Sequence, residues 1–201
     1  QRVIQMGETP EHVHTVGGLG IDNIMRLELL DRKALEQSLE FRLGARNLLI
    51  TFHPVTLEPG ASAAQMAELL AARETLSDTH LLFTMPNADN ENRQLAAMVQ
   101  DFVQRHPATA KAWTSLGQLR YLSCLRHIDG VVGNSSSGLT EAPSFRIGTL
   151  NIGERQQGRL KAASVIDCAP EEKAISAAFK KLYSPKFQAL LKTVETPFGK
   201  P

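Results

Sequence analysis

Small polar residues gather between positions 133 and 138 (GNSSSG), and Glu141 follows one helical turn later. The string comes after an apolar run and opens a stretch of helical character. Backbone N–H groups at a helix start have no partner within the helix, and the helix dipole places partial positive charge there. Ser135 and Ser136 add hydroxyl donors, and their small size lets an anion approach. The pattern predicts a phosphate site; the alternative is an ordinary helix cap with solvent-facing serines.

Two charged residues near this string suggest the rest of a nucleotide. Arg155 follows the next apolar run, where its guanidinium could reach the same anion. Glu141 would repel a phosphate, so we assign it to the vicinal hydroxyls of a ribose, which proteins commonly hold with a carboxylate. Phosphate and ribose together indicate a nucleotide. Taken singly, Glu141 would be interpreted as an exposed helix residue and Arg155 as a solvated surface residue.

His53 ends another apolar run and precedes Pro54. The proline restricts the backbone of the preceding residue to an extended conformation, which projects the imidazole from the strand end. There it could donate to a phosphate, or act as an acid or base near neutral pH. The alternative is a purely structural histidine. We assign no role to the other five histidines.

These polar residues all follow apolar runs that we predict to be strands, and helical patterns separate the runs. The predicted strands cover residues 47–52, 80–85, 111–116, 130–133, 147–152 and 163–167. The predicted helices cover residues 61–76, 95–103, 118–126, 136–144 and 171–182, with another after Pro185. This alternation indicates parallel strands with right-handed crossovers, an α/β fold with a three-layer Rossmann-like sheet. Ligands bind such sheets at the carboxyl ends of the strands. The residues that follow strands are His53, Asn87, Ser115, Asn134–Ser137 and Glu154–Arg155.

Residues 1–45 do not share this alternation, so we divide the chain into 1–45 and 46–201. Within the first part we predict a strand over Val13–Val16, a turn over Gly17–Gly20 and a short helix over Asp31–Leu39. The turn resembles the start of a dinucleotide fingerprint, but Asn23 stands where the third glycine belongs. We therefore favour a glycine hinge.

The composition argues against several functional classes. Lys and Arg number 22 against 21 Asp and Glu, so bulk charge does not favour nucleic acid, and 5% aromatic residues do not make a base-stacking surface. No apolar run approaches the ~20 residues of a membrane helix. Cys124 and Cys168 lie far apart without a metal-binding pattern, which suggests reduced thiols in a cytoplasmic protein and no metal site. The chain begins at Gln1, so we expect a fragment of a longer protein.

The order and spacing of the motifs resemble the UDP-N-acetylglucosamine 2-epimerase family, and more closely its hydrolysing branch, which releases N-acetylmannosamine and UDP. The matching strings span nearly the whole chain: Val16–Asn23 (VGGLGIDN), Thr51–Thr56 (TFHPVT), Pro86–Asp89 (PNAD), Gly133–Gly138 with Glu141, and Asn151–Arg159 (NIGERQQGR). Non-hydrolysing members carry a His-Arg-Arg-Glu-Asn type run where this chain has His-Pro-Val-Thr.

The resemblance implies the GT-B architecture, two Rossmann-like halves with the nucleotide sugar between them. This chain resembles the C-terminal half, 46–201, with the end of the N-terminal domain and the crossing segment in 1–45. By this resemblance Ser135 and Ser136 bind the diphosphate, Glu141 the ribose and Arg155 the nucleotide side. It also implies that His53 and Asn87 line the pocket and that Thr114, Ser115 and Leu116 hold uracil through backbone groups. Uracil and the sugar come from the resemblance alone.

The same resemblance implies a UDP-amino sugar as substrate, with either one acetamido group or two, for sialic-acid-type sugars. It implies no cofactor, and as partners the N-terminal half of the enzyme and further copies of the full-length chain. The catalytic carboxylates and a diphosphate-binding basic residue belong to that missing half. This chain has no paired carboxylates to replace them, so we expect it to be inactive alone, with His53 its only catalytic candidate. Ser137 departs from many relatives, which carry another small residue there.

Two functions of other classes remain open. One is a non-catalytic module that senses UDP-sugars. The other is half of a GT-B glycosyltransferase, which shares the phosphate site at a helix start and the ribose glutamate. The His-Pro-Val-Thr and Gly-Glu-Arg-Gln-Gln-Gly-Arg strings disfavour the transferase.

Overall fold

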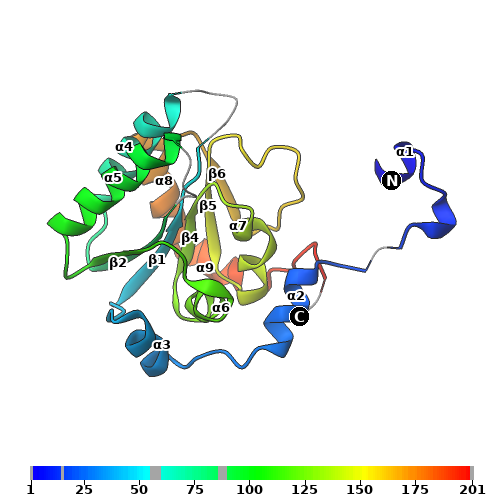
Figure 1. The fold of residues 1–201 in the computed structure, drawn as a ribbon, viewed down its shortest axis with the longest axis horizontal. Helices are drawn as coiled ribbons and strands as arrows, with labels where there is room; N and C mark the ends of the chain where they lie inside the picture. Colours follow the sequence, from blue (N-terminus) through cyan, green and yellow to red (C-terminus); the bar gives the residue numbers. More distant parts are fainter. Residues whose placement is uncertain (1, 15, 55–59, 86–89, 200–201) are drawn as a thin grey trace.

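The computed structural model describes residues 2–14, 16–54, 60–85 and 90–199 (Figure 1). Six strands form one sheet in the order β3-β2-β1-β4-β5-β6, and every neighbouring pair is parallel. The strands are β1 (Arg46–Thr51), β2 (Thr79–Thr84), β3 (Ala110–Trp113), β4 (Gly130–Gly133), β5 (Gly148–Ile152) and β6 (Val165–Cys168). The central strands are almost wholly buried, as their continuous apolar runs require.

Helices cover both faces of the sheet and make three layers (Figure 1). On one face α4 (Ala61–Arg73) packs against both α5 (Asn90–Arg105) and α8 (Glu172–Leu182), which leads into α9 (Pro185–Leu191). On the other face α3 (Arg32–Leu39) packs against α6 (Gly117–His127). The shorter elements are α1 (Arg2–Gln5), η1 (Pro10–His12), α2 (Leu19–Arg26), α7 (Ser137–Thr140) and η2 (Ala142–Phe145). The predicted three-layer α/β fold is confirmed.

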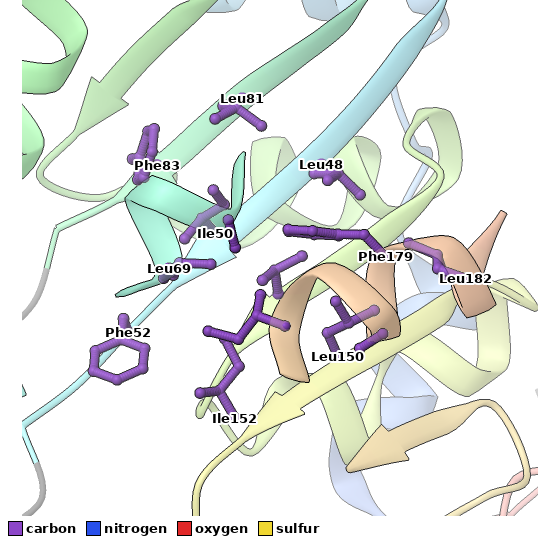
Figure 2. Packing of buried hydrophobic residues seen from close by; sticks show 14 of the residues in the cluster. Leu48, Ile50, Phe52, Leu69, Leu81, Phe83, Leu150, Ile152, Phe179 and Leu182 are labelled. Atoms are coloured by element: carbon purple, nitrogen blue, oxygen red, sulfur yellow. The ribbon is translucent and has the colours of Figure 1, made fainter. Parts of the chain in front are cut away.

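Two hydrophobic cores hold the layers together, because successive side chains of a strand point to opposite faces. Leu48 and Ile50 of β1 enter the larger core under α4 and α8, and Leu49 enters the smaller core under α6. Figure 2 shows the larger core, to which Phe179 of α8 contributes together with Leu48 and Ile50 of β1. The sheet is therefore a rigid support for whatever follows its strand ends.

The chain changes direction across the sheet between β3 and β4. The strands β1, β2 and β3 extend outward to one side, β4 returns to pair with β1, and β5 and β6 extend to the other side. We call the β1–β4 pairing, from Leu48–Gly130 to Thr51–Gly133, the seam. Ligands of open parallel sheets bind beside such a switch point, at the carboxyl ends of the strands.

The prediction of one helix over residues 136–144 is wrong. The helix α7 ends at Thr140, and the 3-10 helix η2 covers Ala142–Phe145 instead. Pro143 has no N–H to donate to the carbonyl of Leu139, and its ring crowds that carbonyl, so the α-helix cannot continue. Two other boundaries are shorter than predicted, since β3 ends at Trp113 and α4 at Arg73.

Two predictions near the N-terminus are also wrong. Val13, His14 and Val16 lie outside any strand, and Val16 is 82% exposed. A strand needs a neighbour to satisfy its backbone groups, and the described chain places none beside these residues. The expected turn also differs, because Leu19 and Gly20 already belong to α2. The predicted helix over Asp31–Leu39 is confirmed as α3, and Asp31 caps it by accepting from the backbone N–H of Ala34 at 2.8 Å.

The first elements, α1 and η1, lie apart from the sheet and contain no buried residue (Figure 1). The helix α3, by contrast, places Leu35 and Leu39 in the smaller core. The division of the chain after residue 45 stays a prediction. Within the described residues, no helix has both the length and the apolar character needed to cross a membrane.

Candidate functional site

A cavity of about 480 Å³ lies at the carboxyl ends of the strands on the β3 side of the seam. Among the described residues, its lining comprises Thr51, His53, Thr84, Met85, Thr114, Ser115, Leu116, Gly117, Gln118, Tyr121, Ser135 and Ser137. Five of these were predicted as site residues from the sequence: His53, Thr114, Ser115, Leu116 and Ser135. The parallel sheet brings them together because all its strands end at the same edge.

Asn134 joins the two sides of the seam beyond the last strand residues. Its side chain is 1% exposed; Oδ1 accepts from the backbone N–H of His53 at 2.7 Å, and Nδ2 donates to the His53 carbonyl at 2.8 Å. The amide thus continues the pairing of β1 with β4 and fixes the backbone of His53. The close approach needs Gly133, whose φ is +130° and where a Cβ would lie 2.0 Å from the Thr51 carbonyl oxygen.

Arg155 is tied to the same residue from the loop after β5. The carbonyl of Asn134 accepts from Arg155 Nη1 at 3.0 Å and from Gln156 Nε2 at 2.7 Å. Burial lowers the pKa of Arg155, and the charge of Arg159 lowers it further. Within the described chain, no carboxylate forms an ion pair with Arg155. An uncompensated cation beside a second guanidinium favours an anion at this edge.

His53 is half-buried beside this cation. Burial lowers its pKa below the ordinary value of 6.5, and the positive charge of Arg155 lowers it further. The imidazole is therefore neutral near pH 7, with one ring N–H able to donate and one ring nitrogen able to accept.

Residues 134–138 lead from β4 into α7. We call them the phosphate loop, after the role that the sequence predicts for them. Ser137 N–H donates to Ser135 Oγ at 3.4 Å, and the carbonyl of Ser136 accepts from Thr140 Oγ1 at 3.1 Å. Ser135 and Ser137 line the cavity, whereas Ser136 is not among the described residues that do so. Gly138 is required because a Cβ there would lie 2.5 Å from Thr149 Cγ2.

The sequence analysis missed Tyr121, which lines the cavity from the second turn of α6. Its hydroxyl hydrogen-bonds Ser137 Oγ. Burial is the main cause that raises the pKa of Tyr121 far above its ordinary value, and the nearby charge of Glu141 adds to it. Nothing in the local sequence distinguishes Tyr121 from other helix residues, because its partner lies on another element.

Glu141 stands half-buried between α7 and η2. Its carboxylate accepts from Thr140 Oγ1, and Oε1 lies 3.3 Å from the position of a Cβ on Gly20 in α2. Glu141 is not among the described residues that line the cavity, although its charge acts on Tyr121, which does line it. The structure therefore places Glu141 beside the cavity, facing α2.

Residues 114–116 join β3 to α6 and line the cavity on the β3 side. We call them the base loop, after the uracil-binding role that the family resemblance predicts for them. Arg120 Nε donates to the Leu116 carbonyl at 2.8 Å, and Nη2 donates to the Ser115 carbonyl at 3.4 Å. Ser115 Oγ accepts from the backbone N–H of Gly117 at 3.1 Å. These bonds fix the loop, and Thr114 and Ser115 remain exposed.

Asn87, the remaining predicted pocket residue, lies outside the described residues. Across the described ranges, no three His, Cys, Asp or Glu side chains are close enough together to hold a metal ion. The described part of the cavity is lined by hydroxyls, backbone groups and a neutral imidazole. Arg155 is not among these lining residues, but its guanidinium binds the Asn134 carbonyl and its charge acts on His53. This set can bind a polar anionic ligand.

A family model described as UDP-N-acetylglucosamine 2-epimerase matches residues 1–201. The chain is 36% identical to a Campylobacter jejuni protein named GDP/UDP-N,N'-diacetylbacillosamine 2-epimerase (hydrolyzing), over 94% of this chain and 48% of the relative. It is 35% identical to the polysialic acid biosynthesis protein P7 of Escherichia coli, over 100% of this chain and 51% of the relative. The chain thus spans about half the length of the curated relatives it matches.

Among solved structures, the chain resembles the S. aureus MnaA-UDP co-structure with a TM-score of 0.71 and 16% identity, over 98% of this chain and 53% of the other. At this identity the likeness concerns the fold. The six-stranded Rossmann-like sheet corresponds to one half of the GT-B architecture, as predicted.

Proposed function

Since the chain belongs to the UDP-N-acetylglucosamine 2-epimerase family, we propose that it is the UDP-binding half of a hydrolysing 2-epimerase. The whole enzyme would convert UDP-N-acetylglucosamine and water to N-acetylmannosamine and UDP, for sialic-acid-type sugars. Support comes from the relatives, one named a hydrolysing 2-epimerase and the other a polysialic acid biosynthesis protein. The half-length coverage supports a second half in the same protein.

The observation that carries this proposal is the convergence on Asn134. Through this residue the structure ties His53, Arg155 and the phosphate loop together at one edge of the sheet. Ser135 and Arg155 suit a diphosphate, because hydroxyl and guanidinium donors bind phosphate oxygens. Ser136 is also assigned to the diphosphate, through its position at the start of α7. The base loop would hold uracil across the cavity, and Glu141 would accept from the ribose hydroxyls.

The proposed chemistry begins with elimination of UDP from the sugar to give a glycal, and water then adds at C1. Negative charge grows on the diphosphate as the C1–O bond breaks, so donors aimed at that oxygen stabilise the transition state more than the ground state. Arg155 and the phosphate loop fit this role, and neutral His53 could donate a further hydrogen bond. The base that removes the C2 proton is assigned to the other half, because no carboxylate lines the described part of the cavity.

The sugar and the assembly are also proposals. The name of the Campylobacter relative favours two acetamido groups, and the groups that contact the sugar would decide between one and two. The proposal of a partner half is supported by α1 and η1, which contain no buried residue, and by Met6, which is 86% exposed. We also propose a homo-oligomer of the full-length protein on the family resemblance alone, and a cytoplasmic location because both cysteines are free thiols.

The first experiment is titration calorimetry of residues 1–201 with UDP and with N-acetylglucosamine. We expect UDP to bind at least tenfold more tightly, since the recognised groups belong to the nucleotide. Arg155→Gln should weaken UDP by about ten- to a hundredfold, the loss of a charged hydrogen-bond partner. Arg105→Gln on α5, which removes an exposed pair with Asp101, serves as the matched control. Equal affinity for the sugar and UDP would refute the proposal.

A glycosyltransferase half and a binding module are separated from the epimerase by activity of the full-length protein. Release of free N-acetylmannosamine, or its diacetamido equivalent, without an acceptor identifies the epimerase. Transfer that depends on an acceptor identifies the transferase, and UDP-sugar binding without turnover identifies the module.

A further inference from the structure

Two adjacent residues near the start of α6 contact both walls of the cavity. Arg120 binds the carbonyls of Ser115 and Leu116 in the base loop, and Tyr121, the next residue, binds Ser137 in the phosphate loop. Adjacent residues of one helix thus contact two loops that follow different strands. Because both contacts come from one helix, α6 fixes the position of the base loop relative to the phosphate loop.

The hydroxyl of Tyr121 hydrogen-bonds Ser137 Oγ, the one partner that the described residues give it. The phenol is protonated at physiological pH, because its ordinary pKa of 10.0 is already well above neutrality, and burial and the charge of Glu141 raise that pKa further. A phenol is more acidic than a serine hydroxyl, so the favoured arrangement has Tyr121 donating and Ser137 Oγ accepting. The serine proton is then free to point elsewhere, and Ser137 lines the cavity.

We propose that Tyr121 is a positioning residue that orients the Ser137 hydroxyl as an additional donor to the diphosphate. The inference rests on the proposed function, because the anion it serves is that of the bound nucleotide. A donor that already accepts a hydrogen bond is polarised and binds an anion more strongly. Ser135, which accepts from the Ser137 N–H, lies beside it on the same wall of the cavity.

The pair is tested by a double-mutant cycle with Tyr121→Phe, Ser137→Ala and the double variant. Calorimetry measures the affinity of residues 1–201 for UDP, pyrophosphate and uridine. Each single variant should weaken UDP and pyrophosphate by about three- to tenfold, the size of one neutral hydrogen bond. Uridine, which has no phosphate, should change less than twofold. The double variant should bind no more weakly than Ser137→Ala alone, because Tyr121 acts through Ser137.

The control is Tyr183→Phe, which changes the only other tyrosine of the chain. Tyr183 follows α8, and its ring lies 4.6 Å from the Arg46 guanidinium at the start of β1, the opposite edge of the sheet. This variant should leave all three affinities unchanged. Thermal unfolding of every variant shows whether a loss of binding follows from a loss of folding.

The assignment of Tyr121 is overturned if Tyr121→Phe weakens uridine as much as UDP. It is equally overturned if the single effects multiply in the double variant, or if Tyr121→Phe leaves UDP and pyrophosphate unchanged while the wild type binds both. If the wild type binds neither UDP nor pyrophosphate, the proposed function itself fails and this inference with it.

Discussion

Replacing Asn134 by alanine should destabilise the protein and weaken its nucleotide site together. The change removes two hydrogen bonds, of 2.7 and 2.8 Å, to the backbone N–H and carbonyl of His53. A buried polar group left without a partner costs about 1–3 kcal/mol. His53 is half-buried, so water can replace part of the lost hydrogen bonding. We therefore expect the free energy of unfolding to fall by about 2–3 kcal/mol for the N–H and the carbonyl of His53 together. For a protein of this size that corresponds to a fall in Tm of about 4–12 °C.

Asn47, near the start of β1, provides a matched control. Its side chain is 2% exposed, accepts from the Gly44 N–H at 2.8 Å and donates to the Gly44 carbonyl at 3.2 Å. Asn47→Ala therefore removes the same pair of contacts at the opposite edge of the sheet. Both variants should lose similar stability in urea titrations. Only Asn134→Ala should also weaken UDP, by about tenfold or more, because Arg155 depends on the position of the Asn134 carbonyl.

Two results would refute this reasoning. A midpoint of urea denaturation unchanged in Asn134→Ala would show that its side chain does not hold the seam. An equal loss of UDP affinity in both alanine variants would show that binding follows global stability rather than the geometry at Asn134. Calorimetry at a temperature well below both unfolding midpoints separates these cases.

Glu141→Gln should weaken the binding of UDP by roughly 1.5–3 kcal/mol, the cost of losing a charged hydrogen-bond partner. The binding of pyrophosphate, which has no ribose, should be unchanged or tighter. If calorimetry shows that both ligands bind equally more weakly, Glu141 has a structural role. Burial and Arg155 lower the pKa of His53 below 6.5, so the unfolded state binds the proton more readily. The free energy of unfolding of the wild type should therefore decrease, relative to His53→Gln, as the pH falls below about 6.5; urea denaturation between about pH 5 and 7.5 tests this, and a constant difference contradicts it. Residues 1–201 alone should release UDP from UDP-N-acetylglucosamine at a near-background rate, because a missing general base costs about a hundred- to ten-thousandfold; near-native turnover by chromatography would place the base in this chain, with His53 and Glu154 the first residues to replace.

The fold was largely predictable because its signals are local. Buried apolar runs identify the strands, their alternation with helices identifies a parallel sheet, and a parallel sheet gathers the strand-end residues. This is why His53, Ser115 and Ser135 were expected at one site. The strand expected over residues 13–16 was wrong because its signal was also local. Residues that favour strands form one only beside a partner strand, and a local pattern does not show whether a partner exists.

The rest of the site depends on contacts between distant parts of the chain. The sequence placed Asn134 at the start of the predicted phosphate site but gave its side chain no role, because its bonds to His53 exist only once β1 and β4 have paired. Tyr121 was missed because its partner, Ser137, lies on another loop. The helix expected over residues 136–144 is interrupted because Pro143 has no N–H to donate and its ring crowds the preceding turn, a signal that the prediction did not use.

The seam also bears on how the protein folds. His53 and Asn134 are 81 residues apart in sequence, whereas the other neighbouring strands pair through much shorter stretches of chain. Closing a longer loop costs more conformational entropy before the contacts that it allows can stabilise the chain. We therefore expect β1–β3 and β4–β6 to form first as two three-stranded units and the β1–β4 pairing to form last. A nucleotide held by the base loop and the phosphate loop would contact both of these units and so stabilise the seam between them. Bound nucleotide would then slow the step of unfolding in which β1 and β4 separate. The lifetime of the folded protein would therefore increase with the nucleotide concentration.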